Sequence, residues 1–193
     1  EFVKDLYQTN IKAGVDVMEF GYKADKEMFD VKDFGKWKFC DDEDIRAVVG
    51  DNNTDLKIAV MADVGRCNYK QDIKPRAESP VDVIRVATYI NQIPAAVDVI
   101  EDAVAKGYEV TCNIMAISNA QEADIRVALD LLGKSPVNVI YIVDSFGALF
   151  PEQIARIAAL YGEYAAKYGK KLGIHAHNNQ QLAFANTVEA VGD

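Results

Sequence analysis

The chain contains two kinds of apolar segment that alternate from one end to the other. Short runs rich in valine and isoleucine predict buried strands at residues 15–22, 56–61, 81–87, 108–117, 137–143 and 172–177. Longer segments with apolar residues at helical spacing predict helices at residues 2–13, 41–49, 93–106, 120–132, 151–168 and 181–191. Four of these helices are expected to end at the glycine that follows them: Gly14, Gly107, Gly133 and Gly169. Residues 24–40 are expected to form a long loop or short helices, and residues 67–80 another sizeable loop.

Strict alternation of strands and helices predicts parallel strands joined by right-handed crossovers. Two folds are compatible with it: an open doubly wound sheet and a (β/α)8 barrel. No G-x-G-x-x-G follows the first strand and no G-x-x-x-x-G-K occurs anywhere, which disfavours nucleotide binding. A barrel gathers its strand ends around one site. The sequence therefore favours the barrel, because polar residues recur near successive strand ends: Glu19, Asp63, Arg85, Asn113, Asp144, Ser145, His175 and His177.

The number of predicted strands is smaller than a complete barrel requires. A (β/α)8 barrel has eight strands in about 250 residues, whereas this sequence predicts six strands in 193 residues. We interpret residues 1–193 as a single, partial barrel domain. A first strand is expected to precede Glu1 and an eighth to follow Asp193, and the chain alone is expected to be inactive or nearly so.

Composition narrows the class of protein further. Half of the residues are hydrophobic, 26% are charged, and the net charge is −9, which is typical of a globular domain. The absence of a basic cluster argues against a nucleic-acid partner. No apolar run is long enough to cross a membrane and no signal-peptide pattern opens the chain. Three widely spaced cysteines predict reduced thiols and a cytoplasmic protein, and Cys112 lies in an apolar run expected in the core.

His175 and His177 are the two histidines of the chain. Residues two apart on a strand project to the same face, so both imidazoles are expected to point in one direction. Neutral imidazoles are common ligands of divalent cations. The alternative is one hydrogen-bonded core histidine and one solvated histidine. We favour the metal-binding interpretation because the pair contains all of the histidine in the sequence.

Three further residues are candidates for catalysis, and each has a structural alternative. Asp144 is expected either to hold a ligand histidine in place or to cap a helix. Ser145 either hydrogen-bonds a substrate or caps the turn. Arg85 either clamps a substrate or forms an ion pair with Glu19 or Asp63, and here the structural alternative is slightly favoured.

Three segments resemble one known family. Residues 173–186, which begin Gly-Ile-His-Ala-His-Asn-Asn, are very similar to the seventh-strand signature of the DRE-TIM metallolyases. This superfamily, also called HMG-CoA lyase-like or pyruvate carboxyltransferase, includes isopropylmalate and homocitrate synthases and 4-hydroxy-2-oxovalerate aldolase. Residues 143–151 resemble the sixth-strand signature, and residues 83–88 resemble the fourth strand of the oxovalerate aldolases. The His-x-His-Asn-Asn piece is the specific one.

The resemblance implies a barrel that uses a divalent cation, Mn²⁺ or Mg²⁺ with Zn²⁺ also compatible, to bind a 2-oxo acid. His175 and His177 match the metal ligands, and Ser145 matches the position that contacts pyruvate. The implied reaction cleaves a 4-hydroxy-2-oxo acid to pyruvate and an aldehyde. A homo-oligomer and a dehydrogenase partner are also implied. The family's Arg-Asp-Gly motif, which supplies an aspartate ligand, is absent.

Two other functions remain open at this point. One is a Claisen-type synthase that joins an acyl-CoA to a 2-oxo acid, although no basic patch for CoA is visible. The other is a non-catalytic barrel that binds a metabolite.

Overall fold

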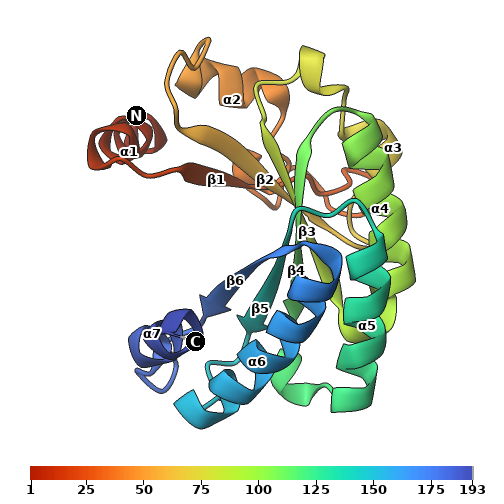
Figure 1. The fold of residues 1–193 in the computed structure, drawn as a ribbon. Coiled ribbons are helices and arrows are strands. Elements are labelled where there is room, and N and C mark those ends of the chain that lie inside the picture. The colour runs from red at the N-terminus through yellow and green to blue at the C-terminus, as the bar shows by residue number, and fades with distance from the viewer. Residues whose placement is uncertain (193) are drawn as a thin grey trace. The chain divides into compact units, whose positions relative to one another are not determined.

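Alternating strands and helices follow one another through the whole structure, a computed structural model that describes residues 1–192. Figure 1 shows the strands and their covering helices. The strands are β1 (Val17–Tyr22), β2 (Lys57–Asp63), β3 (Val83–Tyr89), β4 (Glu109–Met115), β5 (Val139–Asp144) and β6 (Lys171–Ala176). The α-helices are α1 (Phe2–Ala13), α2 (Asp42–Val49), α3 (Tyr69–Asp72), α4 (Ile93–Ala105), α5 (Glu122–Lys134), α6 (Pro151–Tyr168) and α7 (Ala183–Gly192).

Four short 3-10 helices lie in the connections: η1 (Lys36–Lys38), η2 (Arg76–Glu78), η3 (Ile90–Gln92) and η4 (Ile117–Asn119). η1 lies in the first predicted loop, and α3 and η2 lie in the second. All six predicted strands are present, and each bound lies within two residues of its predicted position. The helix predicted at 151–168 has those bounds in the structure.

The chain divides into two compact units, residues Glu1–Val86 with Asp102–Glu109, and residues Ala87–Glu101 with the chain from Val110 onward. The boundary between Val86 and Ala87 falls inside β3, so this strand contributes to both units. The strand order is consecutive in each: β1-β2-β3 in the first and β3-β4-β5-β6 in the second. The β1–β2, β4–β5 and β5–β6 pairs are parallel. A doubly wound sheet reverses its strand order at a switch point, and this order has no reversal. The fold is thus an α/β fold of the (β/α)8 type with six strands described, as predicted.

Branched aliphatic side chains form the core of each unit. Ile45, Ile58 and Ile84 are fully buried in the first unit. Leu129, Leu132, Ile140 and Tyr161 are fully buried in the second, and Cys112 is buried beside them in β4. Strands buried on both faces contain few polar positions, which is why the predicted strands appear as continuous apolar runs.

A buried ion pair fixes the chain that follows β1. The Lys23 ammonium lies 2.8 Å from an Asp42 carboxylate oxygen, and both side chains are at least 93% shielded from solvent. The Ser79 hydroxyl donates to the same oxygen at 3.2 Å. Because an unpaired buried charge is costly, these bonds tie the chain after β1 to the first turn of α2.

One predicted helix end is wrong. Gly133 is expected to end the helix predicted at residues 120–132, yet α5 continues through it to Lys134. A Cβ at Gly133 would overlap the ring of Tyr168. The glycine is therefore explained by the close approach of α5 to the last residue of α6, and not by a left-handed helix cap.

Replacing Gly21 by alanine should lower the free energy of unfolding by about 1–3 kcal/mol. Gly21 lies at a register shift between β1 and β2, its φ is 155°, and a Cβ there would overlap the Trp37 carbonyl oxygen. Denaturant unfolding measures the change. Gly35→Ala, in the loop that follows β1 and with nothing within 4 Å of its added Cβ, is the control and should change stability by less than about 0.5 kcal/mol. Equal effects of the two substitutions would contradict this account of Gly21.

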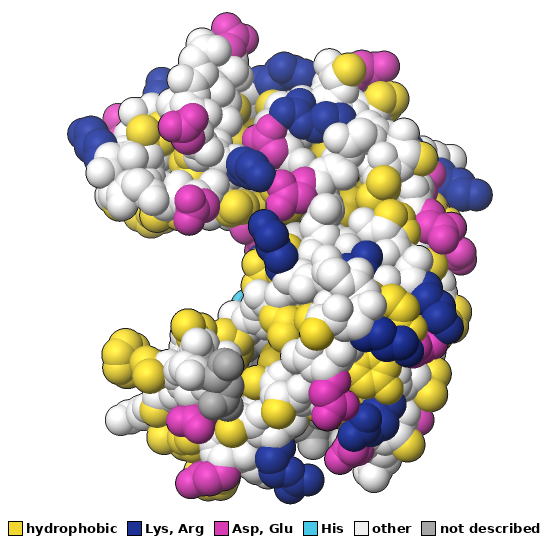
Figure 2. Space-filling view, in the orientation of Figure 1, with side chains coloured by type: hydrophobic (Ala, Val, Ile, Leu, Met, Phe, Trp, Pro, Cys, Tyr) yellow, Lys and Arg dark blue, Asp and Glu magenta, His cyan; other side chains and the backbone are white. Residues whose placement is uncertain are grey.

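Across residues 1–192, no helix is both long enough and apolar enough to cross a bilayer. Several of the exposed large hydrophobic residues lie on α7. α7 presents Phe184, Val188 and Val191, which are 81%, 56% and 76% exposed. Figure 2 shows hydrophobic side chains on the surface over this helix.

Candidate functional site

The two histidines lie at the carboxyl end of β6. His175 is in the strand, opposite Val143 of β5, and His177 follows the strand directly. Their ring centroids are 4.9 Å apart and the ring planes are inclined by 60°. This short separation confirms the expectation that both imidazoles project in one direction.

A hydrogen bond determines which nitrogen of His177 is available. Its Nδ1 lies 2.7 Å from the carbonyl oxygen of Ser145. A carbonyl oxygen only accepts, so Nδ1 carries the proton and the Nε2 lone pair of the neutral ring is left unprotonated. The backbone N–H of His177 also donates to the Asp144 carbonyl, at 3.3 Å. Histidine ligands are commonly oriented by such a bond to the ring nitrogen that does not bind the metal.

The turn after β5 contains the Ser145 carbonyl, and hydrogen bonds to the Asp144 side chain stabilise this turn. Asp144 is fully buried, and its carboxylate accepts hydrogen bonds from the N–H groups of Ala148 and Leu149 at 3.1 and 3.0 Å. Both oxygens of Asp144 are thus occupied by backbone donors of its own loop. The carboxylate braces the turn from which the Ser145 carbonyl reaches His177, and the predicted catalytic role of Asp144 remains a prediction.

Gly147 allows this turn to pack closely against the chain after His177. Its φ is 55°, a left-handed conformation that favours glycine. A Cβ at this position would lie 2.7 Å from the Asn179 amide nitrogen and 2.8 Å from the His177 carbonyl oxygen. Any larger residue would therefore push the turn away from the histidine segment.

Ser145 has a second contact, through its side chain. Its hydroxyl oxygen accepts a hydrogen bond from the Ala116 N–H at 2.8 Å. Ala116 follows β4 and has φ 53°, an uncommon conformation for alanine that surrounding contacts must hold. The Ser145 hydroxyl proton is still able to donate to a bound group, because this bond uses only the oxygen lone pair.

Arg85 and Glu19 lie in the first unit. The Arg85 guanidinium forms an ion pair with the Glu19 carboxylate, at 2.5 Å between Nη1 and Oε2. This confirms the ion pair expected as the structural alternative for Arg85, and its catalytic role stays a prediction. Asp63 ends β2 and lies 3.5 Å from Arg66. Burial, followed by the negative charges of Glu19 and Asp63, raises the pKa of the Tyr22 hydroxyl.

The donors present fit part of a cation site. His175 and His177 offer two imidazoles on one side of the strand, but no group of three or more His, Cys, Asp and Glu residues able to hold a metal occurs within residues 1–192. Burial raises the pKa of the Cys40, Cys67 and Cys112 thiols to about 12. The histidines thus fit as two ligands of an ion that needs further ligands.

Two contacts around the site had no signal in the sequence. In the sequence, nothing distinguishes Ala116, which has a left-handed backbone conformation, from other alanines in apolar runs. Asn186 of α7 is buried, and its amide donates to the Leu149 carbonyl at 2.8 Å, which ties the last helix to the turn after β5. Asn178 accepts from the Ala183 N–H at 3.1 Å and shapes the start of α7.

The strand order and the histidine pair at a strand end define a class of protein, the (β/α)8-type barrels with imidazole donors at the carboxyl ends of their strands. The chain belongs to the HMGL-like family, whose model matches residues 4–193. This confirms the resemblance that residues 173–186 carry.

Relatives with curated names are consistent with membership of this family. The chain is 31% identical over 136 residues to 4-hydroxy-2-oxovalerate aldolase of Geobacillus thermodenitrificans, covering 70% of this chain and 38% of that protein. It is 27% identical over 192 residues to the enzyme of the same name from Bacillus cereus, covering 99% of this chain and 54% of that protein. The chain thus spans about half the length of such relatives, or less.

Solved structures share the fold. The N-terminal domain of a putative aldolase from Bacteroides vulgatus has a TM-score of 0.70 and 24% identity, over 93% of this chain and 58% of that chain. The HMG-CoA lyase of Brucella melitensis has a TM-score of 0.69 and 13% identity, over 100% of this chain and 70% of that chain. At these identities the likeness concerns the fold alone.

Proposed function

We propose that this chain is the part of a divalent-metal-dependent carbon–carbon lyase that supplies two histidine ligands. The proposed reaction cleaves a 4-hydroxy-2-oxo acid to pyruvate and an aldehyde. The observation that carries the proposal is the histidine pair, with ring centroids 4.9 Å apart and Nδ1 of His177 held by a backbone carbonyl. Family membership and the names of the relatives support it.

In the proposed reaction the bond between C3 and C4 of the substrate breaks. The 4-hydroxyl loses a proton and becomes the aldehyde, while C3 keeps the electron pair and later takes up a proton to give pyruvate. A bound Mn²⁺ or Mg²⁺ would polarise the 2-oxo carbonyl and stabilise the negative charge that develops.

The residues of this chain have separate tasks in the proposal. His175 and His177 would hold the ion, with His177 bound through Nε2. The Ser145 hydroxyl, which keeps its proton for donation, would bind the substrate carboxylate. Asp144 would act as a positioning residue, and Arg85, paired with Glu19, is retained as a candidate for stabilising anionic oxygen. A homo-oligomer and a dehydrogenase that takes up the aldehyde belong to the same proposal.

A pyruvate assay tests the proposal. The purified full-length parent of this chain, supplied with Mn²⁺, should release pyruvate from 4-hydroxy-2-oxo acids, measured by coupling to lactate dehydrogenase and NADH. A series of substrates with increasing chain length would identify the preferred aldehyde. Added EDTA should abolish the signal, and excess Mn²⁺ should restore it.

Two results would replace the proposal. Release of free CoA from an acyl-CoA and a 2-oxo acid, with no pyruvate from the hydroxy acids, would indicate the Claisen-type synthase. Binding of Mn²⁺ with no turnover of any substrate would indicate a non-catalytic metabolite-binding protein.

A further inference from the structure

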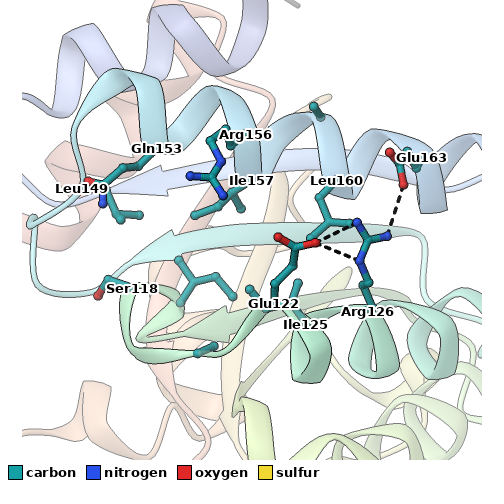
Figure 3. Close-up of a pocket in the computed structure, with 13 residues that line it drawn as sticks. Ser118, Glu122, Ile125, Arg126, Leu149, Gln153, Arg156, Ile157, Leu160 and Glu163 are labelled. Carbon is teal, nitrogen blue, oxygen red and sulfur yellow. Dashed lines mark hydrogen bonds and ion pairs between the residues drawn. The ribbon is translucent and has the colours of Figure 1, made fainter.

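A groove with a volume of about 450 Å³ lies between α5 and α6 in the second unit (Figure 3). Its walls also include η4 and the loop that leads into α6. Apolar side chains make up much of its lining: Ile117, Ile125, Leu149, Ile157 and Leu160. None of the groove residues is among those assigned to the proposed lyase site. The groove is therefore distinct from the proposed lyase site.

At one end of the groove the charged side chains form ion pairs with one another. Arg126 of α5 donates to a Glu122 carboxylate oxygen through Nε at 3.0 Å and through Nη2 at 2.8 Å. Its Nη1 lies 3.5 Å from the Glu163 carboxylate of α6. Figure 3 shows this cluster as a bridge between the two helices. Its one positive charge faces two carboxylates, so this end would not attract an anion.

The other end carries hydrogen-bond donors without acceptors. Arg156 of α6 has no hydrogen bond or ion pair with any described residue, and Figure 3 shows its side chain extending over the groove. The Ser118 hydroxyl oxygen is shielded from solvent and has no hydrogen-bond partner within the described chain. Gln153 uses its amide oxygen to accept from the Phe150 N–H at 2.9 Å, so its NH₂ group is available as a donor.

A buried hydroxyl without a partner is costly. The Arg156 guanidinium, which lines the same groove, presents a fork of donors that matches a carboxylate or phosphate. Next to these donors lie the apolar side chains of Leu149 and Ile157. The complementary ligand therefore has one anionic head and a short apolar body.

We infer that the groove between α5 and α6 is a binding site for a small amphiphilic anion, a carboxylate or phosphate monoester with a short alkyl chain. The head binds Arg156 and Ser118, and the alkyl chain lies over the apolar lining. For a ligand of eight to eleven heavy atoms, dissociation constants are expected to be roughly millimolar or somewhat lower.

Isothermal titration calorimetry of the purified protein with four probes tests the inference. Hexanoate and hexyl phosphate carry both the head and the chain, whereas hexanol lacks the charge and acetate lacks the chain. Hexanoate and hexyl phosphate should bind at least about tenfold more tightly than hexanol and acetate, since a charge-assisted hydrogen bond and a buried alkyl chain each contribute on that scale.

Arg156→Gln should weaken hexanoate and hexyl phosphate about tenfold or more, and Ser118→Ala should weaken them about threefold to tenfold. Arg156 is exposed, so its replacement leaves the fold intact. Arg46→Gln is the matched control. It removes the same charge from an exposed site in the other unit, where the guanidinium donates to the Glu78 carbonyl, and affinity should stay within about twofold.

Three results would overturn the inference. The first is equal affinity of the wild type and Arg156→Gln for hexanoate. The second is binding of hexanol as tight as that of hexanoate, which would leave no role for the anion. The third is an equal loss of affinity in Arg156→Gln and Arg46→Gln, which would indicate a response to net charge and not to the groove.

Discussion

Replacing His177 by alanine should weaken the binding of Mn²⁺ about 100-fold or more and reduce any lyase activity by a larger factor. Loss of a residue that merely orients a metal ligand typically costs about 10- to 100-fold in affinity, and His177 is the ligand itself. His175→Ala should have an effect of the same order, because the two rings lie together at one strand end. Titration calorimetry with Mn²⁺ measures the affinity.

The same measurement separates metal binding from a structural role. His175 is exposed and His177 is half-buried, so either alanine should change the free energy of unfolding by less than about 1 kcal/mol. Gln180→Ala, at an exposed position three residues beyond His177, is the control and should bind Mn²⁺ as the wild type does. If both histidine variants bound Mn²⁺ normally, the imidazoles would not be ligands and the proposed function would fail with them.

Replacing Asp144 by alanine should lower the free energy of unfolding by about 2–5 kcal/mol. The change removes a fully buried carboxylate and leaves the N–H groups of Ala148 and Leu149 without their acceptor, and each unsatisfied buried donor costs about 1–3 kcal/mol. Mn²⁺ affinity should fall about 10- to 100-fold as well, because the Ser145 carbonyl that holds His177 belongs to the same turn. Denaturant unfolding and calorimetry measure the two effects.

Asp144→Asn distinguishes a brace from a catalytic acid. The amide keeps one acceptor oxygen and replaces the other by a donor, so about half of the stability loss and a smaller loss of Mn²⁺ affinity are expected. Asp124→Ala, at an exposed position in the first turn of α5, should be nearly neutral in both assays. An Asp144→Ala variant with normal stability but no activity would show that the carboxylate acts on the substrate and that its role as a brace is wrong.

The turn after β5 explains why one short segment affects so much of the candidate site. Asp144 closes the turn from inside, the Ser145 carbonyl selects the tautomer of His177, and Gly147 allows the close contact with the chain after it. The Ser145 side chain reaches in another direction, to Ala116. The turn therefore links the ends of β4, β5 and β6 through contacts that a single side-chain substitution can break.

The sequence alone determined the order and type of the main elements. Strand and helix periodicity are local properties. Continuous runs of valine and isoleucine predicted the six strands, and apolar residues at helical spacing predicted the helices between them. The alternation of the two predicted that the strands are parallel. The two-residue spacing of His175 and His177 likewise determined that their rings share a face, because that spacing acts through the geometry of one strand.

The tertiary structure decided what depends on contacts between distant segments. It showed that Gly133 allows the approach of Tyr168, that Arg85 forms an ion pair with Glu19 across 66 positions of sequence, and that the Asp144 carboxylate is used by its own loop. No local pattern encodes these partners, because each was one of several polar or small residues with equivalent neighbours in the sequence. Only the packing of strands and loops against one another selects which of them meet.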